Sequence, residues 1–268
     1  MSPYRIYGKI LLLLYLLSGC DKRETYSVQT EKVEVTSPDQ IVLLTDSLVK
    51  PVIYSSLPGL KRLPVKEAKK RFIAGILPAI LVAKHETATK KMKILWLKED
   101  TRWSKEDSTF YLETKEQYKA NDLDDLLLRL ETMPNSIVLA QAAMESGWGQ
   151  SRFFLEANNL FGIWSYRENE PRIAAHQKRK DRTIYVKKYE DVSQAVSDYF
   201  GSLARARAYE GLRQARAVTM DPFKLLPHLK YYSEGRTAYT NKLKKMIVQN
   251  KLTQYDHYRL DPNYLVEE

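Results

Sequence analysis

Residues 138–149 read VLAQAAMESGWG, and this stretch fixes the centre of the predicted fold. It lies within MPNSIVLAQAAMESGWGQSRFFLEANNLFGIW, residues 133–164, which predicts a helix, a turn, a short helix and a strand. Pro134 suits the first turn of the helix, and Gly147 is a natural stop. The one acidic residue of the opening stretch, Glu145, therefore falls in the last helical turn.

Much of the remaining chain also has helical periodicity. Residues 65–98 and 108–134 carry apolar residues at spacings of three and four, and Pro78 should kink the first of these helices or begin a new one. Residues 161–189 mix aromatic and β-branched residues with charged turns, which favours a small antiparallel hairpin, and helical spacing then returns. The sequence predicts a mainly α (α+β) fold: a helical domain with a small antiparallel β lobe, preceded by additional helices.

The amino terminus indicates the compartment. Arg5 and Lys9 precede eight apolar residues, 10–17, which are too few to span a bilayer core of roughly 30 Å. The sequence LSGC then ends at Cys20 and resembles the bacterial lipobox. We therefore expect residues 1–19 to be a lipoprotein signal peptide and Cys20 to be lipidated.

The segment after the lipobox is predicted to be a tether. Residues 20–65 begin with a polar stretch that lacks helical periodicity and end in a part with three prolines and one glycine. Asp21 resembles the signal that retains lipoproteins at the inner membrane of enteric-type bacteria. The expected location is the bacterial cell envelope, with the chain lipid-anchored to a membrane and facing the periplasm.

Composition narrows the chemistry. The chain has 43 Lys and Arg against 33 Asp and Glu, a formal net charge of +10, together with 18 Tyr, 7 Phe and 4 Trp. Such a surface suits a polyanion or a saccharide, but no nucleic-acid motif is present and no nucleic-acid partner is predicted. The four histidines are scattered, Cys20 is the only cysteine, and neither a phosphate loop nor a nucleophile elbow occurs. No metal or other cofactor is predicted, and catalysis by carboxyl groups is the chemistry that the sequence still supports.

Glu145 is the best candidate for such chemistry. It follows three alanines and Met144, and both this apolar setting and the negative end of the helix dipole should raise its pKa. A carboxylic acid that is protonated near neutral pH can donate the proton that glycosidic bond cleavage requires. Trp148 and Phe161 could pack the site or stack on a sugar. On the spacing alone, a solvated glutamate at a frayed helix end is an equal alternative.

The blocks LAQAAMESGWGQSRF and ANNLFGIW resemble the glucosaminidase family of peptidoglycan hydrolases, glycoside hydrolase family 73, and within it the Bax-like branch. The likeness extends from about Lys66 to Leu252. It implies a lysozyme-like catalytic domain over residues 131–252, an N-terminal helical region over 66–130 and a C-terminal tail over 253–268. The implied activity is an endo-β-N-acetylglucosaminidase that cleaves β-1,4 bonds of peptidoglycan glycan strands.

The resemblance also implies site residues. Glu145 matches the family's general acid, and YYSEGRTAYTNKLKKMI matches a segment with a site tyrosine, which aligns best with Tyr232. A shift of one residue would favour Tyr231, and Tyr199 is expected to shape the groove. The residues expected to bind substrate are Trp148, Asn159, Phe161, Trp164, Tyr189 and Tyr231.

A second catalytic group is harder to assign. The β lobe offers Glu168, Glu170 and Asp181, and Glu170 is preferred. Alternatively, the 2-acetamido group of the substrate could act as the nucleophile. Two other functions stay open: a lytic transglycosylase acting on the same substrate, and an inactive lipoprotein that binds peptidoglycan as a scaffold.

Overall fold

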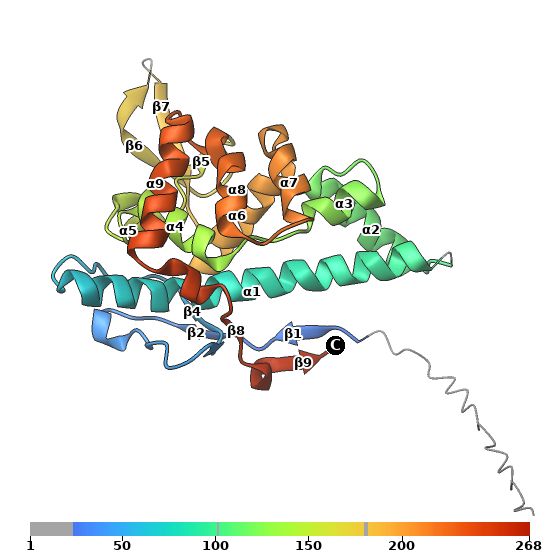
Figure 1. The fold of residues 1–268 in the computed structure, drawn as a ribbon, viewed down its shortest axis with the longest axis horizontal. Helices are drawn as coiled ribbons and strands as arrows, with labels where there is room; N and C mark the ends of the chain where they lie inside the picture. Colours follow the sequence, from blue (N-terminus) through green and yellow to red (C-terminus); the bar gives the residue numbers. More distant parts are fainter. Residues whose placement is uncertain (1–23, 101, 180–181) are drawn as a thin grey trace, which may run out of the picture.

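One long helix organises the molecule. The computed structural model describes residues 24–100, 102–179 and 182–268. Helix α1 (Val65–Glu99) runs across the molecule, with a helical body on one side and short strands on the other (Figure 1). Within the described residues, no helix is both long enough and apolar enough to cross a membrane.

Helix α1 is buried on all sides near its middle because it lies between these two layers. Phe72, Ile76, Leu77 and Ile80 have no measurable exposure, and a helix that is apolar all round requires partners on every side. The sequence predicted that Pro78 would either kink this helix or begin a new one. Pro78 lies inside one continuous helix, so it does not begin a new one.

The helical body follows in chain order. Its α-helices are α2 (Lys105–Tyr118), α3 (Leu123–Arg129), α4 (Asn135–Ser146), α5 (Arg152–Ala157), α6 (Val192–Arg205), α7 (Glu210–Arg216), α8 (Pro222–Leu225) and α9 (Arg236–Gln249). Short 3-10 helices are η1 (Pro38–Gln40), η2 (Arg207–Tyr209), η3 (Leu226–Tyr232), η4 (Leu252–Tyr255) and η5 (Pro262–Tyr264). The helices predicted upstream of the central stretch are confirmed as α1 to α3.

The β lobe projects from the helical body (Figure 1). Its strands are β5 (Trp164–Ser165), β6 (Arg172–Arg179) and β7 (Arg182–Lys187), arranged in the antiparallel order β5-β7-β6. The predicted mainly α (α+β) class, with a small antiparallel lobe and preceding helices, is confirmed.

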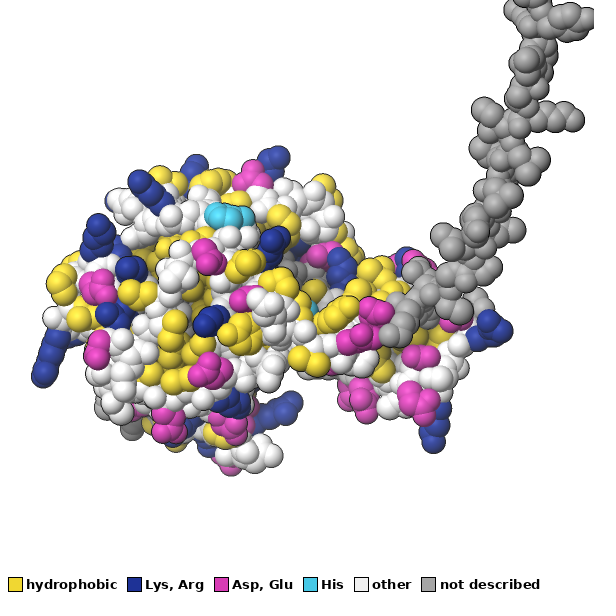
Figure 2. Space-filling model, turned by 90° about the horizontal axis from the view of Figure 1, so that it is seen from below, with side chains coloured by type: hydrophobic (Ala, Val, Ile, Leu, Met, Phe, Trp, Pro, Cys, Tyr) yellow, Lys and Arg dark blue, Asp and Glu magenta, His cyan; other side chains and the backbone are white. Residues whose placement is uncertain are grey.

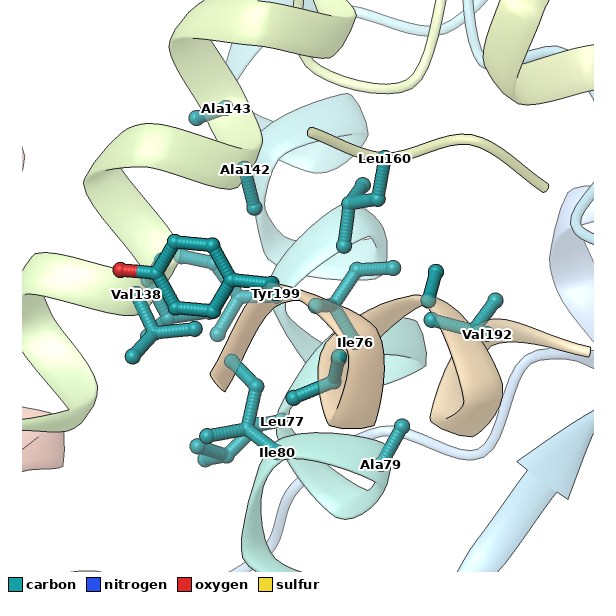
Figure 3. Packing of buried hydrophobic residues seen from close by; sticks show 14 of the residues in the cluster. Ile76, Leu77, Ala79, Ile80, Val138, Ala142, Ala143, Leu160, Val192 and Tyr199 are labelled. Carbon is teal, nitrogen blue, oxygen red and sulfur yellow. The ribbon is translucent and has the colours of Figure 1, made fainter. Parts of the chain in front are cut away.

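Helices α4 and α6 pack on α1 and form the centre of the core. Tyr199 of α6 lies over Val138 of α4 and beside apolar side chains of α1, and its hydroxyl points toward α4 (Figure 3). Helix α6 has one apolar face, because residues at spacings of three and four are buried from Val192 to Ala204. Asp198 of α6 forms an ion pair with Lys187 of the β lobe.

The prediction that residues 20–65 form a tether is wrong for the described part of that segment. Ile41, Ile53, Tyr54 and Leu60 are buried in the main core. The strands on this side are β1 (Tyr26–Val28), β2 (Glu31–Val33), β3 (Leu48–Val49), β4 (Val52–Tyr54), β8 (Arg259–Leu260) and β9 (Leu265–Glu267). The predicted lipidation site Cys20 and its neighbour Asp21 lie outside the described residues.

Long-range strand pairing explains the error. Strand β1 pairs antiparallel with β9, and β3 pairs parallel with β8, so the first and last described segments of the chain lie together. The pair of β2 and β4 is also parallel. Because each strand has only two or three residues and its partner can lie at the far end of the chain, local composition makes this segment look unstructured.

The face formed by these strands mixes both signs of charge with apolar side chains (Figure 2). Lys and Arg are spread among Asp and Glu across it rather than gathered in one patch. Such a mixed surface creates no large field of one sign.

The C-terminal segment also supports helix α4. Pro134 precedes this helix and offers no side-chain cap, but the Asp256 carboxylate accepts hydrogen bonds from the Ser136 backbone N–H at 2.7 Å and from its hydroxyl at 2.8 Å. A carboxylate at a helix N-terminus satisfies free N–H groups and interacts favourably with the helix dipole. Asn135 adds a hydrogen bond to the Tyr255 carbonyl at 2.7 Å.

Candidate active site

Helix α4 ends in a tight turn directly after Glu145. Gly147, Trp148 and Gly149 all have left-handed backbone angles, with φ of 59°, 60° and 77°. A Cβ atom on Gly149 would lie 3.0 Å from the Phe72 ring, so glycine is required there by both angle and space. The turn is closed by a hydrogen bond from the Trp148 N–H to the Ala143 carbonyl at 2.8 Å. It therefore holds the end of α4 closely against α1.

Glu145 is a half-buried carboxyl group with one hydrogen-bond partner among the described residues. The Tyr239 hydroxyl donates to its Oε1 at 3.0 Å. Burial raises the pKa of Glu145 above its ordinary value, and the hydrogen bond from Tyr239 offsets part of this rise. The predicted upward direction of the pKa is confirmed, and burial is its main cause.

A chain of hydrogen bonds extends inward from this pair. Gln141 lies one helical turn before Glu145 on α4, and its Nε2 donates to the Tyr239 hydroxyl at 2.9 Å. The Tyr199 hydroxyl, from α6, donates to Gln141 Oε1 at 2.6 Å. Gln141, Tyr199 and Tyr239 are all buried. Three helices thus meet in one polar network that reaches the surface at Glu145.

The tyrosine in contact with Glu145 is Tyr239, whereas the sequence favoured Tyr232. Tyr232 stacks on Tyr239, with ring centroids 5.7 Å apart, and donates its hydroxyl to the Phe161 carbonyl at 3.1 Å. Both tyrosines belong to the quoted segment YYSEGRTAYTNKLKKMI, where they are seven residues apart. The alternative, Tyr231, is 49% exposed and lies beside Lys230 and Arg236.

Three residues expected to bind substrate are part of the scaffold instead. The Phe161 ring is buried and stacks on Tyr199 at 4.2 Å. The Tyr189 hydroxyl donates to Asp198 at 2.9 Å, and burial raises the pKa of this tyrosine. The buried Asn159 amide bonds the backbone on either side of its loop, so it holds the loop rather than a ligand.

The two tryptophans expected at the site have different settings. Trp148 is half-buried, with its ring edge-on to Phe72 at 5.5 Å and the Lys69 ammonium 4.7 Å from its ring centroid. Trp164 is 39% exposed, its ring centroid lies 6.2 Å from that of Tyr166, and it lines a hollow of about 470 Å3 between α5 and the β lobe. Of the two, Trp164 presents the more open aromatic surface.

Glu170 lies in a cluster of charged residues away from this network. It accepts a hydrogen bond from the Ser165 hydroxyl at 2.7 Å and lies 3.8 Å from the Lys187 ammonium, which also pairs with Asp198 at 2.8 Å. Slight burial raises the pKa of Glu170, but the bonds from Ser165 and the Arg167 backbone, together with Lys187, lower it below its ordinary value. Glu170 is therefore held as a carboxylate.

The charged cluster lines a second hollow. This hollow, of about 800 Å3, lies between α2, α6 and the β lobe. Of the other two acidic candidates, Glu168 is exposed, and Asp181 lies outside the described residues. No group of three or more His, Cys, Asp or Glu within the described residues is arranged to hold a metal ion.

Comparison with known proteins identifies relatives. Residues 121–252 match the glucosaminidase family, described as mannosyl-glycoprotein endo-beta-N-acetylglucosaminidase. Protein Bax of Escherichia coli K12 is 24% identical over 271 residues, which cover 94% of this chain and 97% of Bax. The peptidoglycan hydrolase FlgJ of Escherichia coli is 30% identical over 130 residues, only 44% of this chain and 41% of FlgJ. The crystal structure of the catalytic domain of the autolysin Auto from Listeria monocytogenes is 22% identical, with a TM-score of 0.40 over 60% of this chain and 93% of that domain.

Proposed function

Because the chain belongs to the glucosaminidase family through residues 121–252, we propose that it is a peptidoglycan hydrolase. In this proposal it is an endo-β-N-acetylglucosaminidase that cleaves β-1,4 glycosidic bonds of the cell-wall glycan strand. The observation that carries the proposal is the half-buried Glu145 carboxyl, whose pKa is raised and whose Oε1 is held by Tyr239. The likeness to FlgJ, a peptidoglycan hydrolase by name, supports the choice of substrate.

Glu145 acts as the general acid in this mechanism. The bond between the anomeric carbon and the leaving oxygen breaks as Glu145 gives its proton to that oxygen, which keeps the electron pair. A water molecule then adds to the anomeric carbon and loses its proton to a base. The Tyr239 hydroxyl already donates to Glu145, so it stabilises the carboxylate that remains after proton transfer.

The second catalytic group is proposed to be Glu170 or the substrate's own 2-acetamido group. Glu170 is held as a carboxylate, which a base or nucleophile requires. However, the Glu170 carboxylate already accepts a hydrogen bond from Ser165 and forms an ion pair with Lys187. The 2-acetamido group needs only to be oriented by the site.

The pairing of Glu170 with Ser165 and Lys187 favours one alternative reaction. A lytic transglycosylase needs a single acid and closes an anhydro sugar instead of adding water. Glu145 is the only acidic side chain hydrogen-bonded within the tyrosine network of the described residues. Mass spectrometry of the products distinguishes the two reactions, because the anhydro product is lighter by one water.

We test the proposal on residues 20–268 with purified peptidoglycan. The wild-type chain should solubilise it and release new reducing ends on N-acetylglucosamine, and Glu145→Gln should abolish release. Glu168→Gln is the matched control, because Glu168 is an exposed carboxylate of the β lobe. If wild type binds peptidoglycan without releasing products, the inactive scaffold is the correct alternative.

We also propose that the chain is a lipoprotein of the bacterial cell envelope, anchored through Cys20 and facing the periplasm, with Asp21 directing it to the inner membrane. Thr25 is already buried in the folded body. At most about 18 Å of extended chain would then separate the lipid from the body, because one residue spans at most about 3.6 Å. Labelled palmitate should be incorporated by wild type and not by Cys20→Ser. Density-gradient separation of the two membranes then tests the location.

A further inference from the structure

The Tyr239 hydroxyl has one proton and two neighbours that could receive it. It contacts Glu145 Oε1 at 3.0 Å and the Gln141 amide at 2.9 Å. If the proton goes to Glu145, the Tyr239 oxygen can accept from Gln141. If the proton goes to Gln141, the oxygen can instead accept from a protonated Glu145. The orientation of the Gln141 amide therefore determines which way the acid proton of Glu145 points.

We propose that Gln141 is a positioning residue that fixes the direction of the Tyr239 O–H and thereby keeps the acid proton of Glu145 on Oε2. The inference rests on the proposed role of Glu145 as general acid. With Tyr239 donating to Oε1, that oxygen is an acceptor, so the proton of the neutral carboxyl group occupies the other oxygen. Oε2 has no hydrogen-bond partner in the described part of the chain, which leaves it available to a leaving group.

The opposite orientation of the amide would misdirect the acid. With its oxygen and nitrogen exchanged, Gln141 would accept from Tyr239 and donate to Tyr199. The Tyr239 oxygen would then attract the proton of Glu145, away from the substrate. Both arrangements use the same heavy-atom positions, so the hydrogen-bond network around Gln141 must select between them.

Tyr199 supplies this selection from the other end of the chain of hydrogen bonds. It is 1% exposed, and Gln141 is the only hydrogen-bond partner of its hydroxyl among the described residues. A buried hydroxyl that only accepted from Gln141 would leave its own proton without a partner, which is rarer in folded proteins than an oxygen that accepts nothing. Tyr199 therefore donates its proton to Gln141.

The resulting order runs in one direction. Tyr199 donates to Gln141, Gln141 donates to Tyr239, and Tyr239 donates to Glu145. The titratable groups that face Glu145 from the packed elements are Tyr199 of α6, Tyr232 of η3 and Tyr239 of α9. Burial is the main cause that raises the pKa of each tyrosine, and the Glu145 charge adds to the rise. Only Tyr239 hydrogen-bonds to Glu145 within the described residues, so this direction is passed on through one hydroxyl.

The test removes the groups that orient the Tyr239 hydroxyl and measures the titration of the Glu145 carboxyl. Gln141→Met keeps a similar length without a hydrogen bond, and Tyr199→Phe keeps the ring that stacks on Phe161. Both variants should move the titration midpoint of the Glu145 carboxyl to higher pH, because Tyr239 becomes free to accept from the neutral acid. Carbon-13 NMR of residues 20–268 labelled at glutamate carboxyls follows this midpoint without any substrate, with Glu145→Gln assigning the signal.

The same variants are then assayed on peptidoglycan. We expect kcat to fall about tenfold or more for Gln141→Met, because an acid with a misdirected proton loses part of a contribution of typically 10²–10⁴. The kcat of Tyr199→Phe should fall less, since the Gln141 amide keeps its hydrogen bond to Tyr239. Tyr54→Phe is the control, because it removes another buried hydroxyl that bonds the Val42 N–H in the N-terminal layer. It should change neither measurement.

The two readouts separate the inference from the proposed function. An unchanged Glu145 midpoint in both folded variants overturns the positioning role, whatever the activity. If wild type does not degrade peptidoglycan, the proposed function fails, and the NMR titration still decides the role of Gln141. Because Tyr199→Phe preserves the packed ring, the test survives a failure of Gln141→Met to fold.

Discussion

Glu145 and Glu170 are two carboxyl groups placed in opposite surroundings. Glu145 lies at the end of α4, where burial raises its pKa and one tyrosine hydroxyl is its only hydrogen-bond partner among the described residues. Glu170 lies on the β lobe, where Ser165 and Lys187 keep its pKa below the ordinary value. The helical body favours a neutral acid, and the β lobe favours a charged one. A glycosidase needs one group of each kind.

The groups around Glu145 and Glu170 also differ in charge. The Glu145 network consists of neutral hydroxyl and amide groups, and one of them, the Tyr239 hydroxyl, donates to a carboxyl oxygen of Glu145. The Glu170 cluster contains opposite charges, since Lys187 and Arg205 both pair with Asp198. Charged clusters of this kind often serve only to join two parts of a fold. The predictions below test whether the β-lobe carboxylate reacts at all.

The largest expected effect comes from replacing each carboxyl group in turn. Glu145→Gln should lower kcat by about 10²–10⁴, the usual contribution of a general acid. Glu170→Gln should lower it by less than about tenfold if the substrate's acetamido group is the nucleophile. Initial rates of reducing-end release measure both. An equal loss in the two variants would instead make Glu170 the second catalytic group.

Removing the Tyr239 hydroxyl should have a smaller effect. Tyr239→Phe keeps the stack on Tyr232 but deletes the hydrogen bond to Glu145, which is worth about 1.5–3 kcal/mol to a charged group. The pKa of Glu145 should rise, and kcat should fall about tenfold because the product carboxylate loses its donor. Tyr54→Phe, which removes a buried hydroxyl on the strand side of α1, is the control. Equal rates in the two variants would contradict this role.

The pH dependence of kcat should reflect the two environments. Glu145 must be protonated, so activity should fall as pH rises through a pKa above the ordinary glutamate value. If Glu170 is the base it must be charged, so activity should also fall as pH drops through a pKa below that value. The Glu170→Gln profile tests this assignment. If activity of Glu170→Gln no longer falls at low pH, Glu170 is the group responsible for that fall in wild type. If activity of the variant still falls at low pH, Glu170 is not the base.

The sequence predicted the raised pKa of Glu145 because the apolar setting that causes it is largely local. The alanines before it on α4 are at most five residues away, within two helical turns, and the glycines after it set the tight turn. The partners of Glu145 were not predictable in this way. Tyr239 is 94 residues away along the chain, and only the packing of α9 on α4 brings it to the carboxyl. Periodicity identified both helices without showing which faces meet.

The same limit explains the N-terminal error and the misassigned aromatic residues. The strand partners of β1 and β3 are at the opposite end of the chain, so no local pattern marks them. Phe161 and Tyr189 have residue types that suit a sugar-binding groove, but both are buried against α6. Residue type alone does not distinguish an aromatic ring that binds a sugar from one that packs the core.

The smallest expected effect concerns the support of α4 itself. Asp256→Ala removes the carboxylate that accepts from the Ser136 N–H and hydroxyl at the start of this helix. Loss of such a cap costs about 1 kcal/mol of unfolding free energy and lowers the melting temperature by roughly 2–4 °C. Hydrogen exchange measured by mass spectrometry should quicken in peptides from α4 and not in those from the β lobe.

Asp261→Ala is the matched control, because Asp261 caps the short helix η5 in the same C-terminal segment. It should leave exchange in α4 unchanged. Activity of Asp256→Ala should stay within about twofold of wild type, because Glu145 is held from the other end of the helix by the turn and by Tyr239. Equal exchange in the two variants would mean that the C-terminal segment packs beside α4 without stabilising it. The position of Glu145 would then be set by the helical body alone, just as the position of Glu170 is set by its neighbours Ser165 and Lys187 in the β lobe.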